Sequence, residues 1–290
     1  MFSMQLPTFT DVRRTLTNAV IEMPSVRTEK WQGVDVSKNP AATSYEIRNA
    51  CFEVPLNGNE DLEHWRRDTQ ANIPWADDHF AERVGGEPLN PGVQWANWPW
   101  SPSADKFRTN QRFNHTYMER LWPKFARRTE DGTLPTLSKS ATALRRYPSD
   151  DMRPKFGIAH HYGDLEDLVE LLVAQPFTRQ AFIPLFFPED TGNGDGGRKV
   201  CTLGYQVMVR MSPYGHPEAH IWYPLRSCDL IRHFPDDCYL AVRLLLWVVQ
   251  ECRKRDPLFW NEVRLGTYAM HMTSLHIFEN DKRAILKGGA

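Results

Sequence analysis

The stretch that decides the fold runs from Val200 to Arg255 and contains VCTLGYQVMVRM (200–211), AHIWYPL (219–225) and PDDCYLAVRLLLWVVQECRKR (235–255). The first segment alternates apolar and polar residues, which predicts a strand, and the second predicts another. The third opens with proline and two acids, is apolar in its middle and closes in three basic residues, which predicts a long buried helix. Strands and helices that do not alternate strictly indicate the α+β class.

Two further elements are predicted upstream of this stretch. Apolar residues recur at helical spacing between Asp164, which can cap a helix, and Gln175, and Pro176 ends the pattern. The apolar run 180–187 contains Pro184, which indicates a strand at an edge or a bulge rather than in the middle of a sheet.

Composition limits the classes of function. The hydrophobic content of 41% suffices for one large core, so residues 1–290 are predicted to form a single domain. Lys and Arg number 35 against 36 Asp and Glu, so no net field attracts a nucleic acid or a membrane. Residues 1–23 lack an uninterrupted apolar run, and the five cysteines lack the C-x-x-C spacing of zinc or redox sites. We therefore expect a cytoplasmic protein without a metal site.

Cys201 is the first candidate for chemistry, because it lies where a loop delivers a side chain to the rim of a sheet. The alternative is a small buried hydrophobic residue, the commoner role of a lone cysteine. The order of motifs around Cys201 favours a nucleophile.

These motifs are C-T-L-G-Y-Q (201–206), R-S-C-D (226–229), F-P-D-D (234–237) and S-L-H-I-F (274–278), preceded by F-N-H-T-Y-M-E-R (113–120) and P-F-T-R-Q (176–180). Their order resembles that of the thymidylate synthase superfamily from about residue 113 to 280. The resemblance implies a single α+β domain with a long buried helix and a large mixed sheet at the interface of a homodimer with shared active sites. It also implies transfer of a one-carbon unit from 5,10-methylenetetrahydrofolate to carbon 5 of a pyrimidine nucleotide.

Matched residues would have the following roles. The Cys201 thiolate would add to carbon 6 of the ring and make carbon 5 nucleophilic. Tyr117 would help to remove the proton from carbon 5. Arg226 would hold the phosphate and keep the thiol ionised, and Arg179 would reach the same phosphate from the partner subunit.

Other matched positions concern the sugar and the folate. Ser227 would line the sugar-phosphate side, His276 would contact the sugar 3′-hydroxyl, and Asp229 would hydrogen-bond the folate ring. The chain departs from the pattern at two positions. Gln180 replaces a second phosphate-binding arginine, for which Arg27 or Lys30 could substitute, and Phe278 replaces a tyrosine that contacts the sugar.

The family's water-ordering glutamate has two candidates in the acidic run W-A-D-D-H-F-A-E-R (75–83). Asp78 is preferred and Glu82 is the alternative, and a solvated helix face would explain the same charges. Trp95, like Trp75 and Trp98, is a candidate to stack on the folate, although large aromatic residues are more often core.

Asp237 is predicted to read the base. An asparagine at this position suits uracil, whereas a carboxylate accepts hydrogen bonds from the amino group of cytosine and from a protonated ring nitrogen 3. The alternative is a charge that stabilises the helix N-terminus, a role that Asp236 alone could fill.

The resemblance at Asp237 extends to the deoxycytidylate and cytidylate hydroxymethylases, including those of phages that modify their DNA. We therefore expect conversion of dCMP to 5-hydroxymethyl-dCMP, with CMP and dUMP as other substrates left open. Methylation of dCMP or dUMP is the alternative reaction, and a non-catalytic nucleotide-binding dimer is the alternative of another class.

Overall fold

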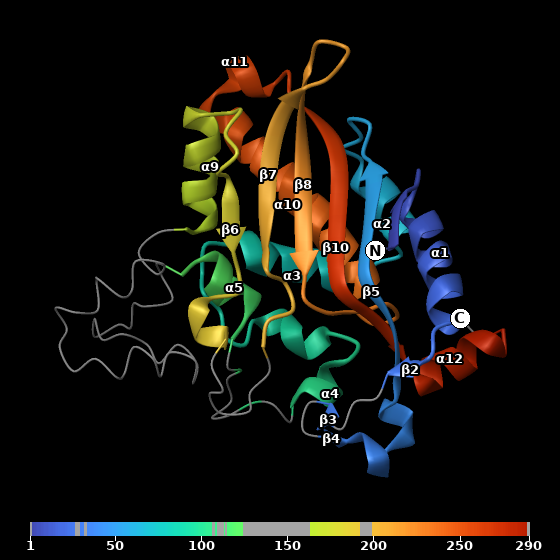
Figure 1. Cartoon of the computed structure of the whole chain (residues 1–290). Helices are drawn as coiled ribbons and strands as arrows, with labels where there is room; N and C mark the ends of the chain where they lie inside the picture. Colours follow the sequence, from blue (N-terminus) through green and yellow to red (C-terminus); the bar gives the residue numbers. More distant parts are fainter. Residues whose placement is uncertain are drawn as a thin grey trace, which may run out of the picture.

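The computed structural model describes residues 2–26, 30–31, 34–105, 108, 113, 115–123, 163–191 and 199–288. Within these ranges an eight-stranded sheet forms the centre of the molecule, with the order β1-β5-β10-β8-β7-β6 (Figure 1). Its strands are β1 (Phe2–Gln5), β2 (Ser25–Val26), β5 (Ser44–Pro55), β6 (Phe182–Pro184), β7 (Gly204–Met211), β8 (Pro217–Leu225), β9 (Cys228–Asp229) and β10 (Arg264–Phe278). A separate ribbon pairs β3 (Lys30–Trp31) with β4 (Val34–Asp35).

The sheet is mixed. β10 runs parallel to β8 and to β9 but antiparallel to β5, and β1 runs parallel to β5. β7 pairs antiparallel with β8 and with β6. The large mixed sheet and the α+β class expected from the sequence are thus confirmed.

The described helices are α1 (Phe9–Ile21), α2 (Leu62–Thr69), α3 (Trp75–Val84), α4 (Ser101–Asp105), α5 (Tyr117–Leu121), α9 (Leu165–Ala174), α10 (Phe234–Arg255), α11 (Pro257–Trp260) and α12 (Glu279–Leu286). Four 3₁₀ turns accompany them: η1 (Val36–Lys38), η2 (Pro40–Ala42), η3 (Val93–Asn97) and η6 (Pro188–Thr191). Among these elements, none is a helix both long and apolar enough to cross a membrane.

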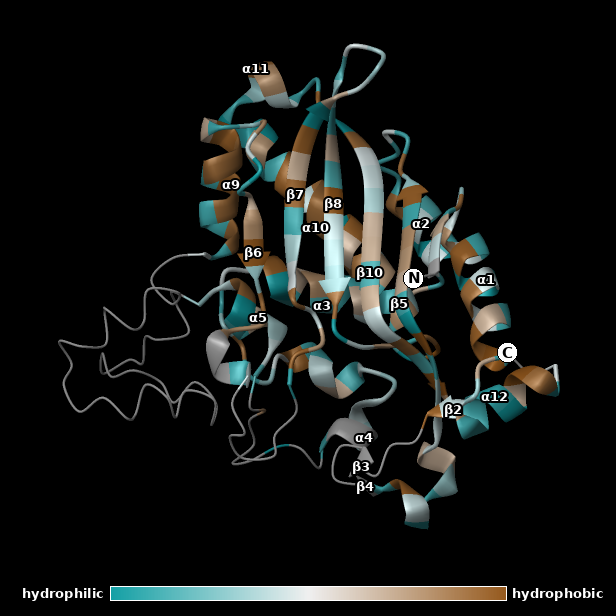
Figure 2. Ribbon diagram, in the orientation of Figure 1, coloured by the Kyte–Doolittle hydropathy of each residue, from teal (hydrophilic) through white to brown (hydrophobic). Residues whose placement is uncertain are grey.

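The predicted long buried helix is α10, which crosses one face of the sheet behind β7, β8 and β10 (Figure 1). The helix begins at Phe234; Pro235, Asp236 and Asp237 lie in its first turn, and basic residues occupy its last turn. The negative charges at its N-terminus and the positive charges at its C-terminus both interact favourably with the helix dipole. Most of its side chains are buried, and Figure 2 shows brown, hydrophobic segments along α9, β6 and α10.

The two elements predicted upstream of the central stretch are also present. Asp164 caps α9 through a capping box with Asp167, and the helix ends at Ala174. Among the strands that the structure describes, β6 pairs only with β7, so it lies at the edge of the sheet, and it contains Pro184 as expected.

β7 begins at Gly204, three residues after Cys201. A Cβ at Gly204 would lie 2.4 Å from the Phe182 ring and 2.5 Å from the Ile183 carbonyl oxygen, so only glycine allows β6 this close. Before the strand, Thr202 forms an isolated bridge with Leu225 at the end of β8. This bridge fixes Cys201 and Thr202 beside the carboxyl end of β8.

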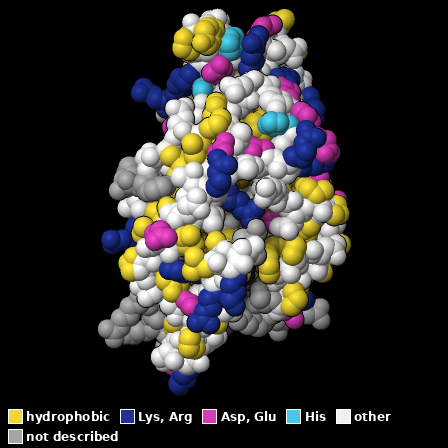
Figure 3. Space-filling model, turned by 90° about the vertical axis from the view of Figure 1, so that its right-hand side faces the viewer, with side chains coloured by type: hydrophobic (Ala, Val, Ile, Leu, Met, Phe, Trp, Pro, Cys, Tyr) yellow, Lys and Arg dark blue, Asp and Glu magenta, His cyan; other side chains and the backbone are white. Residues whose placement is uncertain are grey.

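The other face of the sheet carries half-exposed side chains that alternate with the core residues. They include Met208 on β7, Trp222 on β8 and His271 on β10, and Trp222 is 36% exposed. In Figure 1 this face is turned toward the viewer. The side of the molecule in Figure 3 intersperses Lys and Arg with Asp and Glu, in line with the formal charge of −1.

Candidate active site

Arg226 holds the segment that carries Cys201. The Arg226 amide donates to the Cys201 carbonyl oxygen at 2.9 Å, and its guanidinium donates to the carbonyls of Lys199 at 2.7 Å and Val200 at 2.8 Å. Its Nη2 also lies 3.7 Å from the Cys201 Sγ. Cys201 is half-buried and is a thiol, and a cation at this distance stabilises a negative charge on sulfur.

A chain of hydroxyl groups begins beside Cys201. Thr202 Oγ1 lies 3.2 Å from the Tyr117 hydroxyl and 2.9 Å from the Tyr223 hydroxyl. Tyr223 in turn donates to Asp237 Oδ1 at 3.2 Å. The structure therefore joins Tyr117 and Asp237 through Thr202 and Tyr223, two residues that the sequence analysis did not single out.

Asp237 occupies the first turn of α10. Burial raises the pKa of its carboxyl from 3.8 to about 7. The nearby charge of Asp236 also raises this pKa, while the charge of Arg83 and hydrogen bonds from Tyr223 and Cys228 lower it. Asp237 can therefore be protonated or ionised near neutral pH.

Tyr117 is the first residue of α5, whose N-terminus is fixed by a capping box between Thr116 and Glu119. Burial raises the pKa of the Tyr117 phenol, and the negative charges of Cys201 and Asp237 raise it further. The guanidinium of Arg83 lies 4.3 Å from the centre of the Tyr117 ring. Tyr117 thus stays a neutral hydroxyl at neutral pH.

Arg83 is a site residue that sequence reasoning missed. It is 6% exposed, its Nε donates to His79 Nε2 at 3.0 Å, and it exerts the largest charge effect on the pKa of Asp237. Burial lowers the pKa of His79 to about 4, with Arg83 as the next cause, so His79 is neutral. The available signal was its spacing, because an arginine four residues after a histidine shares its helix face.

Ser227 and His276, which the resemblance assigns to the sugar, lie together. Ser227 Oγ is 3.5 Å from His276 Nδ1, and the His276 ring packs edge-on against Phe278 at 5.3 Å. Burial lowers the pKa of His276. A neutral imidazole has one donor and one acceptor nitrogen, and this ring already interacts with Ser227 and with the backbone of Ser274.

Asp229 is engaged within the chain. Its Oδ1 accepts from the amides of Ile231 and Arg232, both at 3.0 Å, and its Oδ2 accepts from the Arg232 guanidinium at 2.9 Å. Arg232 also pairs with Asp281. These bonds order the turn that precedes α10, and a contact of Asp229 with folate stays a prediction.

The two candidate acids on α3, Asp78 and Glu82, differ in where their side chains point. Asp78 is exposed, whereas the Glu82 side chain turns inward: its Oε1 accepts from the Gln94 amide at 2.9 Å and its Oε2 lies 3.4 Å from His79 Nδ1. Burial is the largest single effect on the pKa of Glu82 and raises it, but hydrogen bonds from His79 and from the amides of Gln94 and Val93 together lower this pKa below its usual value. Of the two acids, Glu82 is joined through His79 to Arg83.

The three candidate tryptophans lie in two separate places: Trp75 and Trp98 in one, and Trp95 in the other. Trp75 stacks on His79 at 4.9 Å and lies 6.2 Å from Trp98, which stacks on His233 at 5.2 Å. His233 immediately precedes α10, so this row of rings leads to the helix turn that carries Asp237. Trp95 instead packs edge-on against Phe113 at 4.9 Å.

The phosphate-binding residues predicted outside the central segment are only partly described. Arg179 and Gln180 are exposed between α9 and β6, and the Arg179 carbonyl accepts from Gln206 Nε2 at 2.9 Å. Arg27 lies outside the described residues. Contact of Arg179 with a partner subunit stays a prediction.

The sequence was compared with models of known protein families and with curated proteins, and it matches none of them. The resemblance to the thymidylate synthase superfamily therefore rests on the ordered sequence motifs alone.

Proposed function

We propose that this chain transfers a one-carbon unit to carbon 5 of a pyrimidine nucleotide, converting dCMP to 5-hydroxymethyl-dCMP. One observation supports this most strongly. A thiol beside a guanidinium lies next to a hydroxyl chain that ends at a carboxyl with a pKa of about 7. Covalent activation of a pyrimidine needs such a nucleophile together with a group that exchanges a proton with the base.

Cys201 and Asp237 carry out the first step, which is covalent addition to the ring. Arg226 stabilises the Cys201 thiolate, which adds to carbon 6 of the ring. Asp237 accepts hydrogen bonds from the cytosine amino group and from protonated ring nitrogen 3, so the positive ring takes up the sulfur more readily. Uracil would place an oxygen against the same carboxylate, and an unpaired buried charge disfavours it by several kcal/mol, on the order of the effects seen for buried ions.

The second step belongs to Tyr117, whose hydroxyl accepts the proton that carbon 5 loses after the new carbon–carbon bond has formed. Water then adds to the exocyclic carbon, and the sulfur of Cys201 is released. Bound 5,10-methylenetetrahydrofolate supplies the carbon at the oxidation level of formaldehyde.

The row of Trp75, Trp98 and His233 offers flat faces that fit a folate ring beside the first turn of α10. The oxygens of Asp229 fit this role less well than the sequence suggested, because three donors of the chain already occupy them.

The proposal includes a homodimer with shared sites. The face of the sheet opposite α10 carries half-exposed side chains, among them Trp222, and His271 Nε2 is buried there with no hydrogen-bond partner among the described residues. A second copy on this face would cover these groups and bring an exposed Arg179 to a neighbouring phosphate.

Release of tritium from carbon 5 of labelled dCMP and dUMP, with and without methylenetetrahydrofolate, tests this function. We expect folate-dependent release from dCMP and a product heavier by one hydroxymethyl group, with dCMP, CMP and dUMP run in parallel for mass analysis. A rise in dihydrofolate absorbance would identify reductive methylation instead. Binding of the nucleotide without release from either substrate would identify a non-catalytic dimer.

A further inference from the structure

We propose that Thr202 and Tyr223 relay a proton between Tyr117 and Asp237, so that the proton lost by carbon 5 is taken up at the Asp237 carboxyl. The inference rests on the proposed function for the origin of the proton. It goes beyond that function by assigning a task to two residues that lie outside the recognised motif roles.

The geometry forms a continuous path. The three oxygen–oxygen distances from Tyr117 to Asp237 are 3.2, 2.9 and 3.2 Å. Each of the four residues comes from a different part of the fold: α5, the bend before β7, β8 and α10. Thr202 is 0% and Tyr223 is 1% exposed, so bulk water does not compete for the two inner hydroxyls.

The hydrogen bonds along this path can all point toward Asp237 or all point toward Tyr117. Three hydroxyls contribute three hydrogens to three bonds. In the structure Thr202 donates to Tyr117 and Tyr223 donates to Asp237. Rotation of the Thr202 and Tyr117 hydroxyls gives the arrangement for ionised Asp237, in which Tyr117 donates to Thr202, Thr202 to Tyr223 and Tyr223 to the carboxylate. With Asp237 protonated, every bond reverses, and the Tyr117 hydrogen points away from Thr202. The protonation state of Asp237 therefore sets whether Tyr117 presents a lone pair or a hydrogen to the substrate.

The proton transfer balances along this path. The carbon 5–hydrogen bond breaks, and its electron pair forms the exocyclic double bond of the nucleotide as the folate nitrogen leaves with its own pair. The proton binds the Tyr117 oxygen, the Tyr117 hydrogen moves to Thr202, the Thr202 hydrogen to Tyr223, and the Tyr223 hydrogen to Asp237. The path thus reverses direction when the proton arrives, and it reverses back when Asp237 loses the proton before the next turnover.

The pKa values of the groups along the path favour Asp237 as the final acceptor of the proton. Burial raises the pKa of both phenols, Tyr117 and Tyr223, so neither keeps a negative charge at neutral pH. Asp237 is the member of the chain whose pKa lies near 7. The charged and titratable groups that interact with Asp237 are Arg83 of α3, Asp236 of α10 and Cys228 of β9, and more distantly Tyr117, Tyr205, Cys238 and Tyr268.

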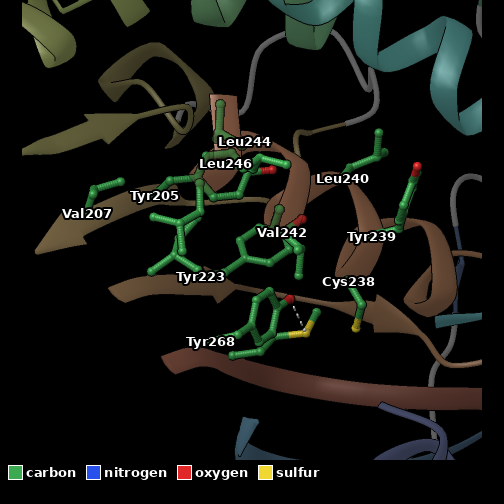
Figure 4. Packing of buried hydrophobic residues seen from close by; sticks show 14 of the residues in the cluster. Tyr205, Val207, Tyr223, Cys238, Tyr239, Leu240, Val242, Leu244, Leu246 and Tyr268 are labelled. Atoms are coloured by element: carbon green, nitrogen blue, oxygen red, sulfur yellow. Dashed lines mark hydrogen bonds between the residues drawn. The ribbon is translucent and has the colours of Figure 1, made fainter. Parts of the chain in front are cut away.

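Two variants interrupt the path, and one buried tyrosine serves as a control. Tyr223→Phe and Thr202→Val each remove a hydroxyl at nearly constant volume, and Thr202→Ser restores one. Tyr268 on β10 is equally buried, but its hydroxyl donates to Met270 Sδ at 3.4 Å; Figure 4 shows Tyr223 and Tyr268 packed in the same core. Tyr268→Phe therefore removes a hydroxyl of the same core that is not a member of the chain.

The measurement is tritium release from carbon 5 of labelled dCMP in mixtures of H₂O and D₂O. A general acid–base step contributes about 100-fold or more, so Tyr223→Phe and Thr202→Val should lose about 100-fold in release rate. Thr202→Ser and Tyr268→Phe should release tritium near the wild-type rate. Movement of several protons at once makes the rate curve with the fraction of D₂O in the wild type, and this curvature should be absent from the two interrupted variants.

A second probe separates proton transfer from folding and binding. 5-Fluoro-dCMP carries no hydrogen on carbon 5, so its covalent complex with Cys201 forms before the relay is used. We expect Tyr223→Phe and Thr202→Val to form this complex as fully as the wild type.

The relay is overturned if both variants release tritium at the wild-type rate with unchanged curvature, or if they lose the covalent complex together with the release. Absence of release from the wild-type protein itself would instead refute the proposed function, and the relay with it.

Discussion

Replacing Asp237 with asparagine should stabilise the unliganded protein at alkaline pH and have little effect at acidic pH. The carboxyl has a pKa of about 7 in the folded chain, against a reference value of 3.8. An acid whose pKa is raised by folding keeps its proton longer in the folded state than in the unfolded state. Folding is therefore penalised increasingly as the pH rises from about 4 to about 7, and the penalty is constant above that range.

The magnitude follows from the two pKa values. A difference of about 3 units at 1.36 kcal/mol each gives a penalty of about 4 kcal/mol above pH 7, of which about 1.5 kcal/mol is already present near pH 5. Loss of the charge-assisted hydrogen bond from Tyr223 offsets roughly 1 kcal/mol of the gain at alkaline pH.

Urea unfolding of both proteins near pH 5 and near pH 8 measures this effect. The difference in free energy of unfolding between variant and wild type should grow by about 2 to 3 kcal/mol between the two conditions. Asp78→Asn, which removes an exposed carboxyl, controls for the loss of one negative charge. A difference that stays the same at both pH values would refute the burial argument for Asp237.

Three further predictions concern the site and its support. Cys201→Ser should form no covalent complex with 5-fluoro-dCMP by intact-protein mass spectrometry, since the hydroxyl is a far weaker nucleophile than a thiolate; a complex of wild-type yield would exclude Cys201 as the attacking group. Glu82→Gln should lower folate-dependent tritium release by at least about tenfold and by more than Asp78→Asn does, because Glu82 alone of the two acids turns inward. The reverse order would favour Asp78. Asp164→Ala should destabilise the protein by about 1 kcal/mol in urea unfolding through loss of the α9 cap, whereas Glu170→Ala, in the same helix, should be near neutral.

Elements with strong local signals were predictable within a few residues. α9 and α10 have a capping acid or proline at one end and a stop or basic turn at the other, and β6 carries the proline of an edge strand. Their periodicity encodes which face is buried, and this is a local property of the chain.

The candidate site was predictable only where a residue belonged to an ordered motif. Cys201, Arg226, Tyr117 and Asp237 were all foreseen, and they lie around one hydroxyl chain and one guanidinium. The sequence named both acids of α3 and preferred Asp78, whereas the structure turns Glu82 inward. Asp78 and Glu82 are one helical turn apart, and periodicity alone does not say which of them will contact a neighbouring element.

The sequence by itself determined the local elements, the α+β class and the identity of the residues that the motifs contain, because these depend on spacing along the chain. Only the tertiary structure decided that Thr202 and Tyr223 connect Tyr117 to Asp237 and that Arg83 lies over the Tyr117 ring. Those contacts depend on the register of β7 against β8 and on the placement of α3, α5 and α10 against them. Register and packing are set by the fit of segments far apart in the sequence, and a shift of one residue would turn Tyr223 to the opposite face of the sheet.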